Sequence, residues 1–202
     1  MNEKYDEYQG FDKLYIAAIT QDDNADYVVG EPEQLAPAGE ISIASNTETA
    51  TKYYDNIPFL NVTTEGATDL TITCPVLPLS KQALITGKNY DEDLKALLDS
   101  GQPVPKYFAL MYRLRFTDGS YRYVVRNKVS ISIGDESAKT LDDSTDSNGM
   151  TLNIKSISTT HVFEKTSKPS KAVIVDERDG GTDVSNWYTE VATPDNLAAK
   201  AS

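Results

Sequence analysis

Short stretches in which apolar and polar residues alternate predict a chain built mainly of β-strands. Alternation places every second side chain on the same face of a strand, so one face can be buried while the other meets water. The stretch "TDLTITCPV", for example, puts Leu70, Ile72 and Cys74 on one face and threonines on the other. The same reasoning predicts strands over 13–20, 27–30, 39–45, 68–76, from about 106 to 133, over 150–163 with a bulge, and over 172–176.

Two stretches change to a helical period. In "LPLSKQALITG", Ser80 is the expected N-terminal cap and Gly87 the expected stop. In "DEDLKALLDSG", Asp91 is the expected cap, leucines follow at helical spacing, and Gly101 is the expected stop. The predicted fold is therefore mainly β, a β-sandwich or barrel-like arrangement with one or two short flanking helices.

Two further segments fit neither pattern. The segment 46–65 is threonine-rich and aromatic, too long for a simple turn and too β-prone for a disordered linker. We predict that it is a protruding strand-loop arm. The segment 134–149 holds five acids and one lysine, which indicates a mobile acidic loop. Either segment could fold only on meeting a neighbouring molecule.

Length and composition bound the remaining possibilities. With 202 residues, 39% of them apolar, we expect one domain over 11–190, a flexible arm over 1–10 and a flexible tail over 191–202. The single cysteine fits a reducing compartment such as a cytoplasm, and neither a signal-peptide pattern nor a membrane-spanning run is expected. A net charge of -12 makes a firm grip on nucleic acid or on an anionic membrane a poor expectation.

The stretch "RLRFTDGSYRYVVR" gathers positive charge in this acidic chain. Its Asp118-Gly119 dipeptide predicts a two-residue type I′ turn, which would place Arg115 opposite Arg122. One face would then be apolar and belong to the core: Phe108, Leu110, Tyr112, Leu114, Phe116, Tyr121, Tyr123, Val125 and Val129. The other face would carry the cations Arg113, Arg115, Arg122, Arg126 and Lys128.

Like charges opposite each other in a sheet cost up to about 1 kcal/mol, so this cationic face needs an explanation. It is either a solvated face whose arginine stems cover apolar surface, or a surface on which acidic side chains pair with the arginines. Those acids would come from elsewhere in the chain or from another copy. We favour the second interpretation.

No set of residues indicates catalysis, a cofactor or a metal. His161 is the only histidine, without a nucleophile elbow to support a triad, and zinc needs more Cys and His ligands than the chain offers. The stretch "DDSTDSNGM" lacks the closing glutamate of a calcium loop. We interpret Trp187-Tyr188 as a core plug for the C-terminal segment, and we expect no enzyme and no cofactor.

An ordered set of stretches over about residues 11 to 190 resembles the major tail protein of long-tailed bacteriophages, in its phi13-like family. These stretches are "FDKLYIAAIT", "VVGEPEQLAPAGEISI", "YYDNIPFLNVTTEGATDLTITCPVLPLSKQALITG", "PKYFALMYRLRFTDGSYRYV" and "NWY". The acidic N-terminal arm and the second helix-like stretch depart from the family. The resemblance implies a tail-tube fold, and subunits that form hexameric rings stacked into a hollow tube for genome delivery.

The resemblance also implies partners and a location. The partners would be further copies of the chain and other tail proteins such as the tape measure and the tail terminator. DNA would pass through the lumen without specific binding, and the protein would be made in the host cytoplasm and reside in the virion tail. The candidate subunit contacts are Thr47, Thr49, Tyr53, Tyr54, Asp55, Arg113, Arg115, Arg122, Arg126, Asp142 and Asp143.

The alternative function is a β-sandwich module for carbohydrate binding or adhesion, because 12 tyrosines and one tryptophan could line a sugar groove. The placement of Tyr112, Tyr121 and Tyr123 separates the two. A lectin would expose them, whereas the pattern above assigns them to a core face.

Overall fold

A computed structural model describes residues 5–134 and 149–200 of the chain. Most of the acidic segment 134–149, with the candidates Asp142 and Asp143, lies outside the described residues. The prediction of a mainly β, sandwich-like fold is confirmed.

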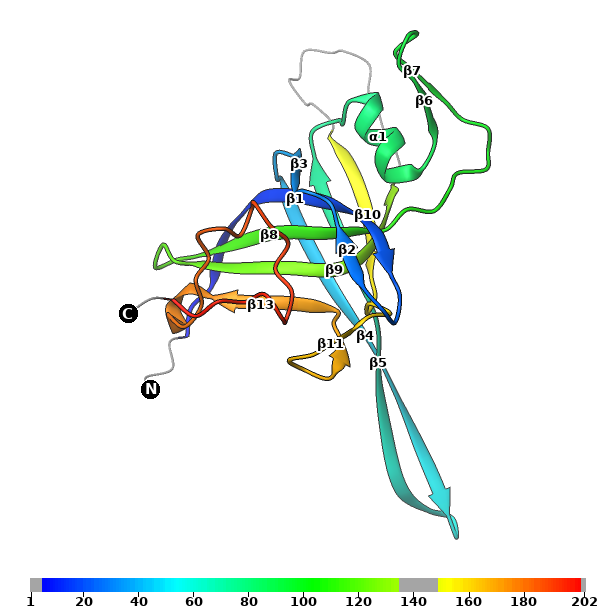
Figure 1. The fold of residues 1–202 in the computed structure, drawn as a ribbon. Coiled ribbons are helices and arrows are strands. Elements are labelled where there is room, and N and C mark those ends of the chain that lie inside the picture. The colour runs from blue at the N-terminus through cyan, green and yellow to red at the C-terminus, as the bar shows by residue number, and fades with distance from the viewer. Residues whose placement is uncertain (1–4, 135–148, 201–202) are drawn as a thin grey trace, which may run out of the picture.

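The described elements follow one another as β1 (Tyr8–Asp22), β2 (Tyr27–Val29), β3 (Glu33–Ala36), β4 (Glu40–Tyr54), β5 (Ile57–Cys74), α1 (Leu79–Thr86), β6 (Asn89–Asp91), β7 (Ala96–Leu98), β8 (Phe108–Phe116), β9 (Tyr121–Ile133), β10 (Met150–Ser156), β11 (Val162–Phe163), β12 (Lys168–Pro169), β13 (Ala172–Asp176) and a 3-10 turn (Glu177–Asp179). One antiparallel sheet has the order β2-β1-β8-β9-β10-β5-β4, with β3 paired to β1 and β13 paired to β9. Strands β8, β9 and β13 run across the direction of β4, β5 and β10, so the sheet is strongly bent (Figure 1).

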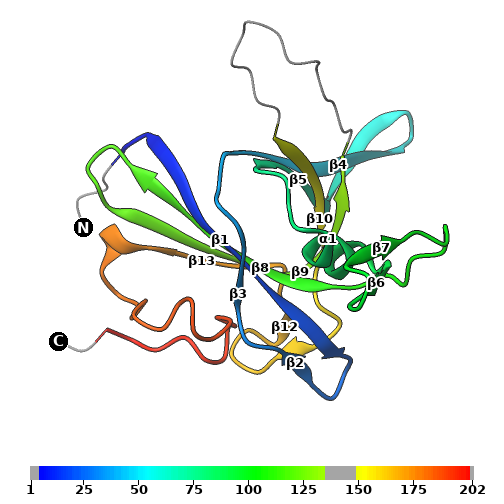
Figure 2. The same cartoon turned by 90° about the horizontal axis from the view of Figure 1, so that it is seen from above.

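Two apolar cores lie on the two faces of β1, β8 and β9. The first packs side chains of β5 and β10, such as Ile72 and Leu152, against β1 and β8, and Ile85 of α1 joins it. The second lies on the other face, where the C-terminal segment covers Met111 and Val125. Figure 2 shows this segment folded along one side of β13. Trp187, only 3% exposed, belongs to the second core, which confirms the interpretation of a C-terminal plug.

The turn between β8 and β9 differs from the prediction. It has three residues, and Gly119 supplies the positive φ of 89° that ends such a loop. Arg115 therefore pairs with Tyr121 instead of Arg122. A shift of one residue moves every side chain of a strand to the other face. The predicted single arginine face is wrong: Arg113 and Arg115 lie on one face of the sheet, while Arg122 and Arg126 lie on the other.

One of the two expected helices forms. Helix α1 ends at Gly87 as predicted, with a φ of 72°, but its N-terminal cap is Pro78 and not Ser80. The second expected helix, over 91–101, is wrong: it is the small hairpin β6–β7. Asp91 closes the turn of this hairpin by accepting hydrogen bonds from the backbone of the next residues. The hairpin leaves Leu94 and Leu98 73% and 50% exposed.

Three boundaries also differ from the pattern-based ones. The expected strand over 150–163 is divided, since β10 ends at Ser156 and β11 starts at Val162. Strand β1 starts at Tyr8, inside the expected arm, because Tyr8 pairs with Phe116 of β8. In the expected tail, Val191 is buried against the second core. Within the described residues, no helix has the length and apolar character that crossing a membrane requires.

Candidate self-association surface

The distal part of β4 and β5, residues 47–65, leaves the body of the protein as a long two-stranded hairpin (Figure 1). Its pairing starts at Thr47 with Glu65 and continues to Tyr54 with Ile57. The prediction of a protruding arm over 46–65 is confirmed. We call residues 47–65 the projecting hairpin.

Local sequence explains why this segment forms a hairpin. Asp55 and Asn56 both adopt a positive φ, 49° and 64°, as the two central residues of a type I′ turn require. Asn and Asp tolerate this conformation better than other residues with a side chain. Across the strands, the hydroxyls of Thr49 and Thr63 lie 3.2 Å apart and share a hydrogen bond. Threonines and aromatic residues favour the extended strands on either side.

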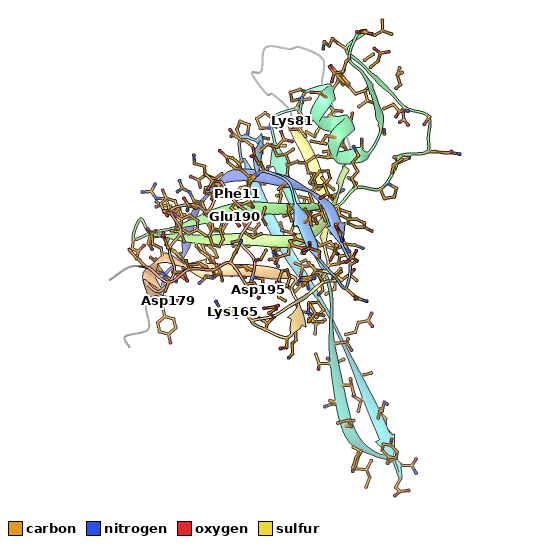
Figure 3. All side chains as sticks on the ribbon, in the orientation of Figure 1. Phe11, Lys81, Lys165, Asp179, Glu190 and Asp195 are labelled. Atoms are coloured by element: carbon orange, nitrogen blue, oxygen red, sulfur yellow. The ribbon has the colours of Figure 1, made fainter. Side chains whose placement is uncertain are left out.

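The projecting hairpin is exposed along its whole length. Figure 3 shows its side chains extending to both sides with no other element of the chain beside them. Its large apolar side chains are between 40% and 76% exposed: Tyr53, Tyr54, Ile57, Phe59, Leu60 and Val62. A two-stranded hairpin is marginally stable alone in water, and monomeric proteins rarely expose so many clustered apolar groups. The hairpin therefore has the character of a contact surface.

The base of the hairpin is tied to the body. Lys171, directly before β13, donates hydrogen bonds to the carboxylate of Glu65 at 2.9 Å and to the carbonyl oxygen of Gly66 at 2.7 Å. The hydrogen bond from Lys171 lowers the pKa of Glu65. Asn46 donates to the carboxylate of Asp69 at 2.8 Å on the opposite strand. These contacts fix the direction in which the hairpin leaves the sheet.

The outer face of β4, β5, β10 and β9, opposite the first core, is hydrophilic. One row across the four strands consists of short uncharged side chains, Ser42, Thr71, Asn153 and Ser132. In the next row, Lys155 lies 3.9 Å from Asp69. Such a face is suited to contact with water and offers little to hold a polyanion.

Two of the arginines on β8 and β9, Arg113 and Arg122, form ion pairs with acids of the same chain. Arg113 forms a bidentate pair with Asp12 of β1, with N···O distances of 2.6 and 2.9 Å, and stacks on the ring of Tyr121 at 3.9 Å. The pair with Asp12 raises the pKa of Arg113. On the other face, Arg122 contacts the carboxylate of Asp176 at 2.8 Å. For Arg113 and Arg122, the acids that the sequence analysis expected come from within the chain.

The two other arginines differ from this pair. Arg115 is exposed on β8. Arg126 is partly buried beside Tyr112. Burial raises the pKa of Tyr112, and the nearby Arg126 charge opposes the effect.

The candidate residues thus separate into groups. Thr47, Thr49, Tyr53, Tyr54 and Asp55 come together in the projecting hairpin, whereas the arginines are distributed over two faces of the sheet. Sequence reasoning missed the apolar residues of the returning strand, although "IPFLNV" carries four large apolar side chains. It also missed the acids that pair with the arginines, because they are more than 50 residues away along the chain.

The positions of three tyrosines bear on the two predicted functions. Tyr112 is fully buried in the first core and Tyr123 is 8% exposed in the second, while Tyr121 is partly buried. Tyr112 and Tyr123 are buried as predicted, but the single core face predicted for them is wrong, because they lie on opposite faces of the sheet. Neither of them is available to line a sugar groove. Among the described residues, no group of three or more His, Cys, Asp and Glu side chains could hold a metal ion.

Comparisons with known proteins add little to this picture. No protein-family model matches the chain, and no curated protein matches it. Among solved structures, the chain is similar to the anti-feeding prophage cap, described as a tube terminating cap and determined by cryo-EM. The sequence identity is 12%, the match covers 87% of this chain and 96% of that one, and the TM-score is 0.40. Likeness at this level does not assign a function.

Proposed function

We propose that this protein is a structural subunit of a phage tail tube, and that copies associate side by side in hexameric rings that stack into a conduit for the genome. The observation that carries the proposal is the projecting hairpin, an exposed, apolar and aromatic extension that, among the described residues, contacts the rest of its own chain only at its base. The ring number and the tube follow from the resemblance of the sequence to phage major tail proteins.

The energetics fit an assembly with many repeated contacts. Fully burying a large apolar side chain contributes about 1.5–3 kcal/mol. The six large apolar side chains of the hairpin are on average a little more than half exposed, which corresponds to about 5–10 kcal/mol in total if all become buried. Association itself costs about 4–15 kcal/mol. One hairpin contact is therefore weak, whereas a ring or stack that forms several contacts per subunit is stable.

The sheet also supports lateral growth. Strand β4 ends the sheet on one side, and β2 and β3 lie at the other. Edge strands present unpaired N–H and C=O groups that another chain can pair with. In a closed ring such pairing continues the sheet from one subunit to the next and removes its edges.

The hydrophilic outer face of β4, β5, β10 and β9 suits a wall of the lumen. Its short uncharged side chains offer no cationic cluster to hold DNA, and the net charge of -12 opposes adhesion. We propose that DNA passes without specific binding, and that the further partners are other tail proteins such as the tape measure and the tail terminator. The subunit is then a non-enzymatic virion component that needs no cofactor.

The test removes the projecting hairpin. Residues 47–65 are replaced by Asn-Gly, which joins the strands at Asn46 and Gly66 with a type I′ turn. We expect a folded monomer, shown by parent-like emission of the single Trp187, that forms neither rings nor tubes in negative-stain micrographs. Sedimentation of the parent over a range of concentrations is the control. A parent that stays monomeric throughout refutes the proposal, and normal tubes from the shortened variant refute the assignment of the hairpin.

A further inference from the structure

Strand β13 forms a border of the sheet that lies outside the main strand order. It pairs with β9 over residues 122–126, while β10 pairs with β9 over 129–133. The sheet continues from β10 to β5 and β4, whereas no described strand pairs with the outer edge of β13 (Figure 1). The backbone N–H and C=O groups along that edge can therefore pair with an added strand.

The first core ends at β13 and leaves an apolar side chain uncovered there. Val124 of β9 is 3% exposed and belongs to the first core. Ile174, the residue of β13 that pairs with Val124, is 55% exposed. A strand added beside β13 would place a side chain against Ile174 and extend the apolar surface.

Two buried polar groups near this edge have no partner within the described part of the chain. Tyr112 is fully buried, and its hydroxyl forms no hydrogen bond. Arg126 lies beside Tyr112, and its Nε–H group is buried without an acceptor. Burying a donor without an acceptor is unfavourable, and more so when the group is charged. Both groups are therefore suited to an acceptor that another molecule supplies.

Arg126 also carries a charge that no described acid neutralises by an ion pair. Three arginines do form ion pairs with acids of the same chain: Arg113, Arg122 and Arg178. The carboxylate of Glu65 accepts a hydrogen bond from Lys171 at 2.9 Å. That bond lowers the pKa of Glu65, and the Arg126 charge adds to the effect without an ion pair between them. A carboxylate from outside the chain would supply the missing charge.

The residue of β13 that pairs with Arg126 is Ala172. Its side chain ends at Cβ, so the longer arginine side chain can extend across it toward the outer edge. On an added strand, the residues beside Ala172 and Ile174 would be two positions apart and on the same face. An acid at the first position and an aliphatic residue at the second would match what β13 presents.

From these features we infer that the outer edge of β13 binds an extended segment of another protein, with a carboxylate at Arg126 and an aliphatic side chain at Ile174. In strand addition of this kind, backbone hydrogen bonds give affinity and the alternate side chains give specificity. A carboxylate is the acceptor that a guanidinium binds most strongly. The inference goes beyond the proposed function, because this edge is not one of those assigned to lateral growth and binding needs no assembly.

The test is fluorescence polarisation with a short fluorescein-labelled peptide. The peptide has a central glutamate, a threonine on either side of it and a valine beyond each threonine, so either strand direction presents the same pattern. The protein is kept dilute enough to be monomeric in sedimentation. We expect saturable binding to the parent, and binding weaker by at least about tenfold when the peptide carries glutamine in place of glutamate. A parent that does not bind the glutamate peptide overturns the inference.

Variants of the protein assign the carboxylate contact. In Arg126→Gln the glutamate and glutamine peptides should bind equally, because the charge that separates them is gone. A purely structural role of Arg126 would weaken both peptides and preserve their ratio, which would overturn the inference. Arg115→Gln, an exposed arginine on the other face of the sheet, is the matched control and should bind like the parent.

A further variant does not depend on a buried residue. Ile174→Glu changes an exposed side chain, so the fold should persist, with parent-like emission of Trp187. The new charge lies beside the valine of the peptide and near its glutamate, so binding should weaken by at least about tenfold. Parent-like binding of this variant would overturn the inference.

Amide hydrogen exchange locates the added strand. The glutamate peptide should slow exchange in residues 172–176 and leave the projecting hairpin, residues 47–65, unchanged. Slower exchange in β4 or β2 instead would overturn the assignment to β13. If residues 172–176 become protected only as copies of the chain assemble, and the peptide has no effect, the occupant is a second copy and the inference is overturned while the proposed function stands.

Discussion

The cluster around Asp176 lends itself to a quantitative test of what the arginines contribute. Its carboxylate accepts hydrogen bonds from Arg178 at 2.8 and 2.9 Å and from Arg122 at 2.8 Å. Arg178 also stacks on the ring of Phe116 at 3.6 Å. The cluster joins β13 and the following turn to the end of the β8–β9 hairpin. The perturbation is Asp176→Asn, which preserves the shape of the side chain and removes its charge.

The magnitude follows from burial. The side chains of Asp176 and Arg178 are 10% and 11% exposed, and that of Arg122 is 33% exposed. Removing one partner of a buried ion pair costs about 3–5 kcal/mol, and less where a guanidinium still reaches water. We expect a loss of about 2–4 kcal/mol in the free energy of unfolding. For a chain of this length that corresponds to a decrease in Tm of about 5–15 °C.

The assay is urea unfolding followed by the emission of Trp187, the single tryptophan, which is buried in the second core. The control is Asp179→Asn, an exposed acid three residues further along the chain (Figure 3), which should change stability by less than about 0.5 kcal/mol. If Asp176→Asn unfolds like the parent, the cluster is a surface feature and this reasoning is refuted.

The pH dependence gives a second check. The hydrogen bond from Arg178 lowers the pKa of Asp176 below its ordinary value of 3.8; burial opposes this shift, and Arg122 adds to it. A carboxylate with a lowered pKa stabilises the folded state above its unfolded pKa, and this contribution is lost as pH falls through the folded value. The difference in stability between parent and Asp176→Asn should therefore be full at pH 6 and decrease below about pH 4. A constant difference over that range would contradict the assignment.

Two further expectations concern stability. Gly87→Ala places a Cβ 1.9 Å from the carbonyl oxygen of Val104 and should lower the free energy of unfolding by several kcal/mol, measured in thermal melts. The control is Gly101→Ala, at a similar positive φ with nothing within 4 Å of the added Cβ, which should cost only about 1–2 kcal/mol. Equal costs would show that the contact with Val104 is not tight. Asp22→Ala leaves the Lys128 ammonium, 13% exposed, without its partner at 2.5 Å and should cost about 3–5 kcal/mol in urea unfolding, a result that an unchanged midpoint would contradict.

The sequence alone determined the features that depend on neighbouring residues. Alternation was enough to place most of the long strands, including Leu70, Ile72 and Cys74 on a buried face. Composition was enough to identify the protruding arm, because a threonine-rich and aromatic segment favours strands while lacking the apolar periodicity of a core element. The end of α1 at Gly87 was likewise predictable from local sequence, since a residue in the left-handed conformation ends a helix wherever it occurs.

The tertiary structure alone decided the features that depend on distant residues. The stretch 91–101 has helical spacing, yet its residues pair as part of the β6–β7 hairpin beside α1. The three-residue turn at Gly119 differs from the predicted one by a single residue, and that difference separates the arginines onto two faces. Asp12 and Arg113 are 101 residues apart in sequence and meet because β1 pairs with β8. A local pattern cannot encode such a meeting, because strand register and pairing are set by the packing of the whole sheet.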